Sequence, residues 1–333
     1  MQQAATHDEL VETMTGGMVS AIEPFQGSDR LRSDGRPRGD LRNKLRLING
    51  RRNAFTCLIC LALPVAVITG VVLVGHWIAV VVAVPIVGVL QVRMFILSHE
   101  GAHRLLFTNR RLNDFIGITI FGWLAFGTGT HAYRKAHTSH HRDEFGPKEP
   151  DFLLYALYPI TAASMRRKLR RDCSGVSAYR ILRPRLTGLF RRQFLVNSLR
   201  FYVGQLFVFG LFAVSGNPFL YLVLWVLPYV TVYQILNRLR AIAEHGGMTR
   251  SGDRRDTAHH VKQSQVARAI IVPLGVGHHL AHHVDSGIPF RNLAQLTKLL
   301  EDDGYLTSDL TWSSYRRLWR ALTTPNATTS ARN

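Results

Sequence analysis

Histidine is concentrated in three short runs of this 333-residue chain. The runs are HEGAH at 99–103, HTSHH at 137–141 and HHLAHH at 278–283, and they contain nine of the fifteen histidines. Residues at positions i, i+3 and i+4 of a helix share one face, so the spacing predicts that each run directs its imidazoles to one side of a helix. Neutral imidazole is the commonest metal ligand among side chains. The pattern therefore favours metal binding over a set of solvated side chains.

The number of clustered histidines predicts more than one metal ion. Eight imidazoles of the runs, together with the isolated His245, exceed the four ligands of a tetrahedral zinc site. Two ions with four or five nitrogen ligands each fit this count. Imidazole binds zinc, copper, iron and nickel alike, so the ligand type by itself leaves the metal open.

Two long stretches without charge must position these histidines. Residues 54–92 and 201–237 contain no Asp, Glu, Lys or Arg. Since about 20 apolar residues cross the hydrocarbon core of a bilayer, each stretch is long enough for two crossings. Turn-forming sequences at 75–77 and 215–218 would separate the crossings. We predict an all-α integral membrane protein, with four transmembrane helices in two hairpins and a cytoplasmic helical cap that holds the metal site.

The net charge of +19 agrees with this topology. Neither predicted turn contains Lys or Arg, whereas the segments outside the uncharged stretches 54–92 and 201–237 contain all of them. By the positive-inside rule, both termini and the metal site are expected on the cytoplasmic side of a bacterial-type inner membrane or its equivalent. Because topology accounts for the positive charge, no nucleic-acid partner is predicted.

The predicted order of segments follows from these patterns. An apolar segment at 114–130 is too short to match the crossings above, and a crossing there would put HEGAH and HTSHH on opposite sides of the membrane, so we predict an interfacial helix. The segments are a polar, partly disordered N-terminal segment (1–53), hairpin 1 (54–98), a cytoplasmic segment with two histidine runs and the interfacial helix (99–193), hairpin 2 (194–240), and a cytoplasmic C-terminal segment with the third run (241–333).

The histidine motifs resemble the histidine boxes of the membrane fatty acid desaturase and hydroxylase superfamily. The similar stretches are HEGAHRLLFTNRRLNDFIG, HTSHHR, AEHGG and HHLAHHVDSGIPFRNL, and the similarity covers about residues 54–300. It implies a non-haem di-iron centre that activates O2 with two external electrons and removes hydrogen from an aliphatic chain. The ligands that it implies are His99, His103, His137, His140, His141, His245, His279, His282 and His283.

Three departures from the family pattern concern the surroundings of these ligands. Ala281 stands where the family often has Glu, and Asp285-Ser286 stands where an aromatic residue and Pro often follow the last box. Some members have Asn one helical turn before the solitary histidine, where this chain has Ala241, with Asn237 a further turn back. These changes leave the implied ligands in place and alter the substrate pocket and one water-mediated contact.

Other polar residues are assigned weaker roles. His131, His278 and Asn237 are candidates to hydrogen-bond the ligands. The carboxylates of Asp143, Glu144 and Asp151 could orient imidazoles, but solvated charges are the preferred interpretation. His259-His260 lies in a polar stretch and is expected to face solvent.

The predicted activity is O2-dependent desaturation of a fatty acyl or similar aliphatic chain by a membrane-bound non-haem di-iron oxidoreductase. It would use two Fe ions, O2 as co-substrate, an acyl-thioester or lipid substrate, and a separate ferredoxin-like or cytochrome-like electron donor. A di-iron hydroxylase of a lipid or small aliphatic intermediate is the first alternative. A zinc transporter or sensor is the second, although the predicted spans have no ionisable residue near the membrane midplane, where transport sites lie.

Overall fold

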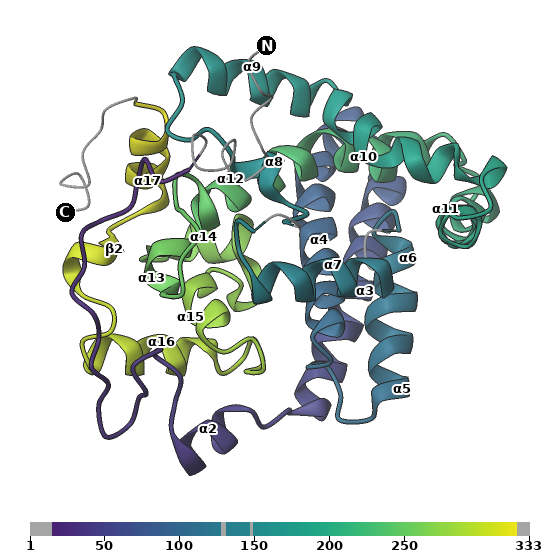
Figure 1. The fold of residues 1–333 in the computed structure, drawn as a ribbon. Coiled ribbons are helices and arrows are strands. Elements are labelled where there is room, and N and C mark those ends of the chain that lie inside the picture. Colours follow the sequence, from purple (N-terminus) through teal and green to yellow (C-terminus); the bar gives the residue numbers. More distant parts are fainter. Residues whose placement is uncertain (1–14, 128–130, 147–148, 325–333) are drawn as a thin grey trace. The chain divides into compact units, whose positions relative to one another are not determined.

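The computed structural model describes residues 15–127, 131–146 and 149–324 as a mostly helical protein (Figure 1). The chain forms two compact units that alternate along the sequence. Residues 48–134 and 167–237 form one, called here the membrane unit. The other, called the histidine unit, consists of the chain up to residue 47, residues 135–166 and the chain from residue 238 onward.

Four helical stretches of the described residues are long and apolar enough to cross a membrane. They are Gly39–Val74, Trp77–Ala102, Leu195–Val214 and Leu222–His245, and the first includes both α2 (Gly39–Leu45) and α3 (Gly50–Val74). This agrees with the four predicted spans. The first break falls at Gly75, whose positive φ of 61° ends α3 before α4 begins at Trp77. The second falls between Val214 and Leu222, so both predicted turns separate helices.

The spans of the membrane unit are joined by buried amide side chains. The first three are α3, α4 (Trp77–Ala102) and α11 (Leu195–Val214), and α3 packs against α4. The last begins with the π-helical turns η3 (Leu222–Val226) and η4 (Tyr229–Tyr233) and continues as α12 (Gln234–His245). Gln91 donates a hydrogen bond to the carbonyl of Trp225 at 2.8 Å. Polar bonds of this kind satisfy backbone groups that lipid cannot.

The described part of the predicted interfacial segment folds as two short helical pieces against α4, and residues 128–130 lie outside the described residues. The pieces are η1 (Asp114–Phe121) and α6 (Gly122–Leu124), and α5 (Arg110–Asn113) precedes them and packs on η1. Gly117 meets Gly101 of α4 so closely that a Cβ on Gly117 would lie 2.6 Å from the Cα of Gly101. Asp114 is held by Arg134, with 3.0 Å between Oδ2 and Nη1. The segment is not one of the four candidate spans, and its interfacial position stays a prediction.

The remaining helices of the membrane unit pack on the start of α11. They are α10 (Val176–Leu186) and the 3-10 turn η2 (Gly188–Phe190), while α9 (Ala162–Cys173) contributes residues to both units.

Short helices and one pair of parallel strands make up the histidine unit. The helices are α2, α7 (His131–Arg142), α8 (Phe152–Tyr155), α13 (Arg254–Thr257), α14 (Gln265–Ile270), η5 (Pro273–Gly275), α15 (His279–Val284), α16 (Leu293–Asp302), η6 (Ser308–Leu310) and α17 (Tyr315–Leu322), and the strands are β1 (His260–Val261) and β2 (Thr311–Trp312). The first residues of α7 belong to the membrane unit.

Residues 15–47, called here the N-terminal strap, are ordered, although their composition predicts partial disorder. Leu31 and Leu45 are buried in one apolar cluster with Leu280 and Val284 of α15. Arg42 lies with Nε 2.6 Å from the carboxylate of Asp285, directly after α15. The prediction of disorder is therefore wrong for these residues, because partners far along the chain order them. Residues 1–14 lie outside the described residues.

Candidate metal centre

Two helices and the end of a third bring seven predicted ligands into the histidine unit. His137, His140 and His141 share α7, and His279, His282 and His283 share α15, as the spacing predicts. His245 is the last residue of α12. The helix ends there because Gly247, two residues on, has a φ of +75° that a side chain would strain.

The first group of imidazoles consists of His140, His245 and His283, all buried. Their possible ligand atoms lie within 4.8 Å of one another. His279 joins them, because its Nε2 lies 2.8 Å from Nε2 of His245. Two nitrogens bound at right angles to one ion, each at about 2.1 Å, would lie about 3 Å apart. The four rings thus have the spacing of ligands around a single ion.

The second group in the histidine unit consists of His137, His141 and His282. Their possible ligand atoms again lie within 4.8 Å of one another. The Nε2 atoms of His137 and His141 are 3.0 Å apart, which is the separation expected of two ligands on one ion. The histidine unit therefore has two groups of imidazoles compatible with metal binding, and the expected number of two ions stays a prediction.

His99 and His103 belong to the membrane unit. His99 lies in the last turn of α4 and is buried, and His103 caps that helix. Their ring centroids are 4.8 Å apart, so this pair also faces one direction. That the pair completes the second group stays a prediction.

Carboxylate and carbonyl oxygens hold the far side of the first group of rings. Because these oxygens accept hydrogen bonds, each Nδ1 that contacts them carries the hydrogen, and Nε2 is left to bind a metal. The hydrogen bonds are His140 Nδ1 to Glu149 Oε2 at 2.7 Å, His283 Nδ1 to Glu144 Oε1 at 2.6 Å, and His245 Nδ1 to the carbonyl of Thr257 at 2.7 Å. Nδ1 of His279 lies 3.3 Å from Glu244 Oε1 without forming a hydrogen bond.

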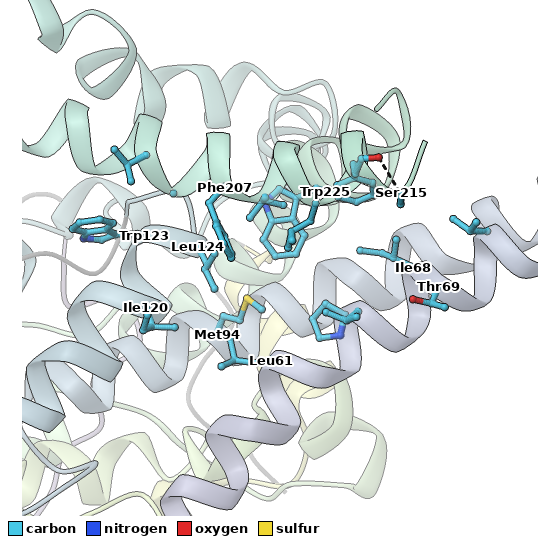
Figure 2. A pocket seen from close by; sticks show the side chains of 18 of the residues that line it. Leu61, Ile68, Thr69, Met94, Ile120, Trp123, Leu124, Phe207, Ser215 and Trp225 are labelled. Carbon is cyan, nitrogen blue, oxygen red and sulfur yellow. Dashed lines mark hydrogen bonds between the residues drawn. The ribbon is translucent and has the colours of Figure 1, made fainter. Parts of the chain in front are cut away.

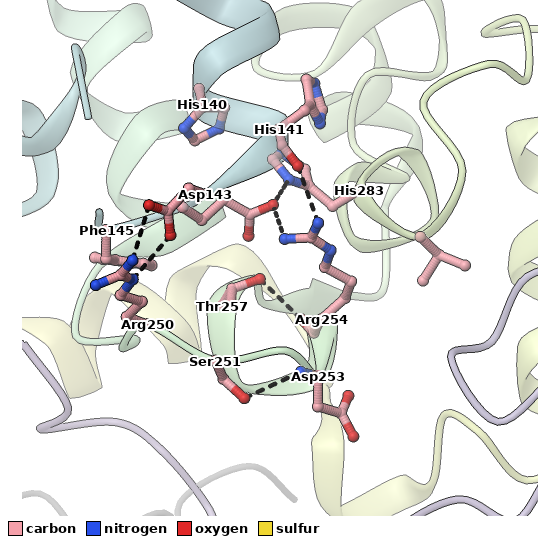
Figure 3. Close-up of polar contacts among 12 residues, drawn as sticks. His140, His141, Asp143, Phe145, Arg250, Ser251, Asp253, Arg254, Thr257 and His283 are labelled. Atoms are coloured by element: carbon pink, nitrogen blue, oxygen red, sulfur yellow. Dashed lines mark hydrogen bonds and ion pairs between the residues drawn. The ribbon is translucent and has the colours of Figure 1, made fainter. Parts of the chain in front are cut away.

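Arg254, labelled in Figure 3, balances the charge of the fully buried Glu144. Its Nη1 lies 2.5 Å from Glu144 Oε1, and its Nη2 donates to the carbonyl of His141 at 2.9 Å. Burial raises the pKa of Glu144, while the positive charge of Arg254 opposes that rise. One arginine thus fixes both the carboxylate behind His283 and the end of α7.

Two rings of the first group, those of His279 and His283, are in the neutral state that metal binding requires. Burial, together with neighbouring imidazoles, lowers the pKa of His279 and of His283 well below the usual value, so both are neutral at pH 7. For His140, burial lowers the pKa, but the hydrogen bond and charge of Glu149 outweigh it and the net pKa is raised. The hydrogen shared with Glu149 sits on Nδ1, which keeps Nε2 of His140 directed at the group.

Two buried atoms test whether a metal fits. Nε2 of His283 and Oε2 of Glu144 have no hydrogen-bond partner among the described residues. Buried polar atoms in folded proteins nearly always have a partner. A bound metal ion would supply the partner that these two atoms lack. Neutral imidazoles and one carboxylate are donors that zinc and iron accept. The residues present fit a metal centre.

Comparison with known proteins identifies the family. The model of the fatty acid desaturase family matches residues 75–316, which is most of the chain. The chain belongs to the fatty acid desaturase family. It is similar to dihydrorhizobitoxine desaturase from Bradyrhizobium elkanii, with 28% identity over 251 residues that cover 69% of this chain and 70% of the relative. This desaturase-family chain is therefore a desaturase-like oxidoreductase, and with its four apolar helices it is an integral membrane protein.

Sequence reasoning missed several residues that orient the ligands of this desaturase-family chain. Glu149, Glu244 and Thr257 were not singled out, although Glu244 directly precedes a predicted ligand. Glu144 was interpreted as a solvated charge, and that interpretation is wrong, because its side chain is buried against His283. Asp143 does lie on the exposed side, where it pairs with Arg250 at 2.8 and 2.9 Å (Figure 3). Asp151 donates its backbone N–H to Glu149.

The weaker candidates lie elsewhere. His278 bonds through Nδ1 to the hydroxyl of Thr297 at 2.9 Å rather than to a ligand. His131 is exposed at the start of α7, and Asn237 is half-buried in the membrane unit, and their contacts with ligands stay predictions.

The expectation that His259 and His260 face solvent is wrong, since both are buried. His259 bonds the carbonyl of Gly246 at 2.8 Å, and His260 contacts Glu301 at 3.1 Å. Their burial could not be predicted from their polar neighbours in sequence, because the groups that they contact come from other parts of the histidine unit.

Proposed function

We propose that this chain is an O2-dependent desaturase that uses two non-haem iron ions to introduce a double bond into a fatty acyl or similar aliphatic chain. The observation that carries the proposal is the pair of histidine groups on α7, α12 and α15, whose nitrogens converge within ligand distances. Family membership supports the redox chemistry.

The proposed ligands divide between the two ions. The first ion would take the group that contains His245, and the second would take the other group together with the pair on α4. The first set is His140, His245, His279 and His283, and the second is His99, His103, His137, His141 and His282.

When bound, the irons would supply the oxidant, made from O2 and two electrons, that removes hydrogen from an unactivated C–H bond. The protein's part is to orient the ligands and exclude water. Glu149 and Glu144 keep hydrogen on the Nδ1 atoms of His140 and His283. Tyr155, almost fully buried, packs with its ring centroid 5.0 Å from that of His245. An apolar wall of this kind protects a reactive centre from water.

The proposed partners follow from the reaction balance. Removing two hydrogens while O2 is reduced to water needs two further electrons, and these would come from a separate ferredoxin-like or cytochrome-like donor. The distribution of Lys and Arg supports a cytoplasmic position for both termini and for the metal centre.

Metal analysis tests the ligand assignment. The purified chain should contain about two irons and consume O2 with a suitable reductant. His140→Ala and His282→Ala each remove a ligand from one ion, so iron content and product should fall together. His76→Ala, which alters an exposed helix cap far from both groups in sequence, should retain both. Tightly held zinc without O2 consumption would favour a zinc transporter or sensor instead.

The substrate has a second candidate class, and the reaction has an alternative. Because the similar protein from Bradyrhizobium elkanii is named as a dihydrorhizobitoxine desaturase, a compound related to dihydrorhizobitoxine is a second candidate substrate besides a fatty acyl chain. Mass spectrometry of lipids, acyl thioesters and small polar metabolites, with and without expression, distinguishes these substrates. Loss of two hydrogens from a metabolite supports desaturation, whereas gain of one oxygen supports a hydroxylase.

A further inference from the structure

The membrane unit contains an elongated apolar cavity of about 760 Å³. It is bounded by α3, α4, α11, η1, α6 and η3 (Figure 2). Among the residues that line it, the polar hydroxyl groups are those of two threonines and one serine. None of the nine predicted metal ligands lines it. The cavity is therefore suited to a hydrocarbon and is separate from the histidine groups.

The length of the cavity fits an extended chain. Trp123 lies at one end, and Thr69 and Ser215 lie at the other (Figure 2). The lining residues of α11 and its C-cap run from Val203 to Ser215, which is about 18 Å at a rise of 1.5 Å per residue. The hydrocarbon core of a bilayer is about 30 Å thick, so one leaflet contributes about 15 Å. The cavity thus has the depth of one acyl layer.

The cavity is open to the lipid phase at its side. Val65 and Leu73 of α3 and Phe207 of α11 line it and are also 57%, 80% and 61% exposed. A tail of a membrane lipid can therefore enter sideways between α3 and α11. An apolar cavity of this kind does not hold ordered water. The surrounding bilayer consists of acyl chains, so an acyl chain is the expected occupant.

The Trp123 end of the cavity carries positive charge. Gln205 of α11 donates to the carbonyl of Trp123 at 3.2 Å, which places this end beside the middle of α11. Arg200 lies one turn before Gly204, a lining residue, on the same face of α11. No Asp or Glu occurs between Cys173 and Glu244. An anionic headgroup would find a positive partner here and no nearby acidic residue along this stretch.

We propose that this cavity binds one acyl tail of an anionic membrane phospholipid, whose headgroup pairs with Arg200. The lipid is a resident of the membrane unit and is distinct from the substrate of the metal centre. The proposal rests on the spans and their cavity, so it stands apart from the assignment of iron and of the substrate.

Native mass spectrometry of the full chain with phosphatidylglycerol and phosphatidylcholine of identical tails tests the proposal. The wild type should retain one phosphatidylglycerol with about fivefold preference over phosphatidylcholine, the effect expected of one cation near anionic lipid. Leu211→Trp fills the cavity and should lower retention of both lipids about tenfold, since about two buried methylene groups lose their place. Arg200→Gln should abolish the preference while the neutral lipid is still retained.

Matched variants separate these effects from general changes of surface. Leu206 is another exposed leucine of α11 that does not line the cavity, so Leu206→Trp should retain lipid like the wild type. Arg110→Gln alters an exposed arginine of α5 and should keep the preference. Equal losses in Leu206→Trp and Leu211→Trp would overturn the proposal, as would turnover lost in Leu211→Trp with lipid retention unchanged, because the substrate would then be the occupant.

A measurement on the wild type avoids any doubt about the folding of the variants. Phosphatidylglycerol with a photoactivatable tail should label peptides from 61–73 and 203–215, the cavity-lining stretches of α3 and α11. Labelling that is spread evenly over the exposed faces of all four spans would refute a specific site.

Discussion

The carboxylates behind the histidines decide which nitrogen of each ring carries the hydrogen. Glu149→Gln keeps the size of the side chain but removes the charge that accepts from His140. Loss of such a partner lowers metal affinity about 10–100-fold. Iron retained against graded chelator concentrations measures this, and we expect retention to fall in that range.

Glu301→Gln is the matched control for this prediction. It removes a carboxylate from His260, a pair that resembles Glu149 and His140 but lies outside both histidine groups. Iron retention in this variant should equal that of the wild type. If the two variants lose iron equally, the effect of Glu149 is on folding and not on its ligand.

At the scale of residues, the arrangement of the histidines could be predicted from the sequence, whereas their hydrogen-bond partners could not. His137, His140 and His141 share a helix, so their spacing alone indicates a common face. Glu149 lies after the end of α7 in a stretch without helical periodicity. Its position depends on how that stretch folds back on His140, which no local pattern specifies.

The contact between α4 and η1 makes a prediction at the scale of elements. Gly117→Ala would put a Cβ 2.6 Å from the Cα of Gly101, a backbone atom that cannot rotate away. The two elements must separate, and overpacking of this kind costs about 1–3 kcal/mol. Thermal unfolding of the detergent-solubilised protein should therefore occur at a lower temperature.

Gly70→Ala provides the opposite expectation within the same unit. A Cβ at this position of α3 meets nothing within 4 Å, and alanine favours helix over glycine by up to about 1 kcal/mol. The midpoint temperature of thermal unfolding should be unchanged or higher than that of the wild type. A lower midpoint in both variants would show that the close approach of Gly117 is not the cause.

The N-terminal strap makes a second prediction about elements. Arg42→Met leaves the buried Asp285 without its 2.6 Å partner, and loss of a charged hydrogen bond costs about 2 kcal/mol. Because Asp285 ends α15, iron should also be released more readily. Chemical unfolding and chelator competition measure the two effects.

Arg32→Met is the control on the same strap. Arg32 is exposed and lies 3.8 Å from Asp34, which is also exposed, and such pairs contribute about 0.5 kcal/mol or less. Little change is expected in stability or iron retention. Comparable losses in the two variants would contradict a specific role for Arg42.

The strap also shows why sequence reasoning failed for one element. Its many arginines and glycines lack apolar periodicity, so composition indicated disorder. Its order comes from residues about 240 to 275 positions away, such as Asp285 and Asp303. Contacts that distant leave no trace in local patterns.

At the scale of the whole molecule, the sidedness of the membrane topology can be tested with thiols. Cys173 is exposed, whereas Cys57 and Cys60 are buried. A membrane-impermeant thiol reagent should label Cys173 only from the cytoplasmic side. In a Cys173→Ser background, Ser215→Cys, at the exposed end of α11, should be labelled only from the opposite side. Labelling of both positions from one side would refute the proposed topology.

The spans could be predicted because their signal is local and strong. Long stretches without charge and turn residues at 75–77 and 215–218 mark four helices, and the structure has them. The division into two units could not be predicted, because each unit combines stretches from different parts of the chain. Neither charge nor hydropathy records which distant stretches pack together.

The alternation of the two units along the chain has a consequence for biogenesis. The ribosome completes His137, His140 and His141 well before it reaches His279, with two candidate spans made in between. Insertion into the bilayer must therefore precede closure of the ligand shell. Loading of the proposed irons would then be a late event, and a nascent chain that stalls before α15 would expose an incomplete set of ligands to any metal in the cell.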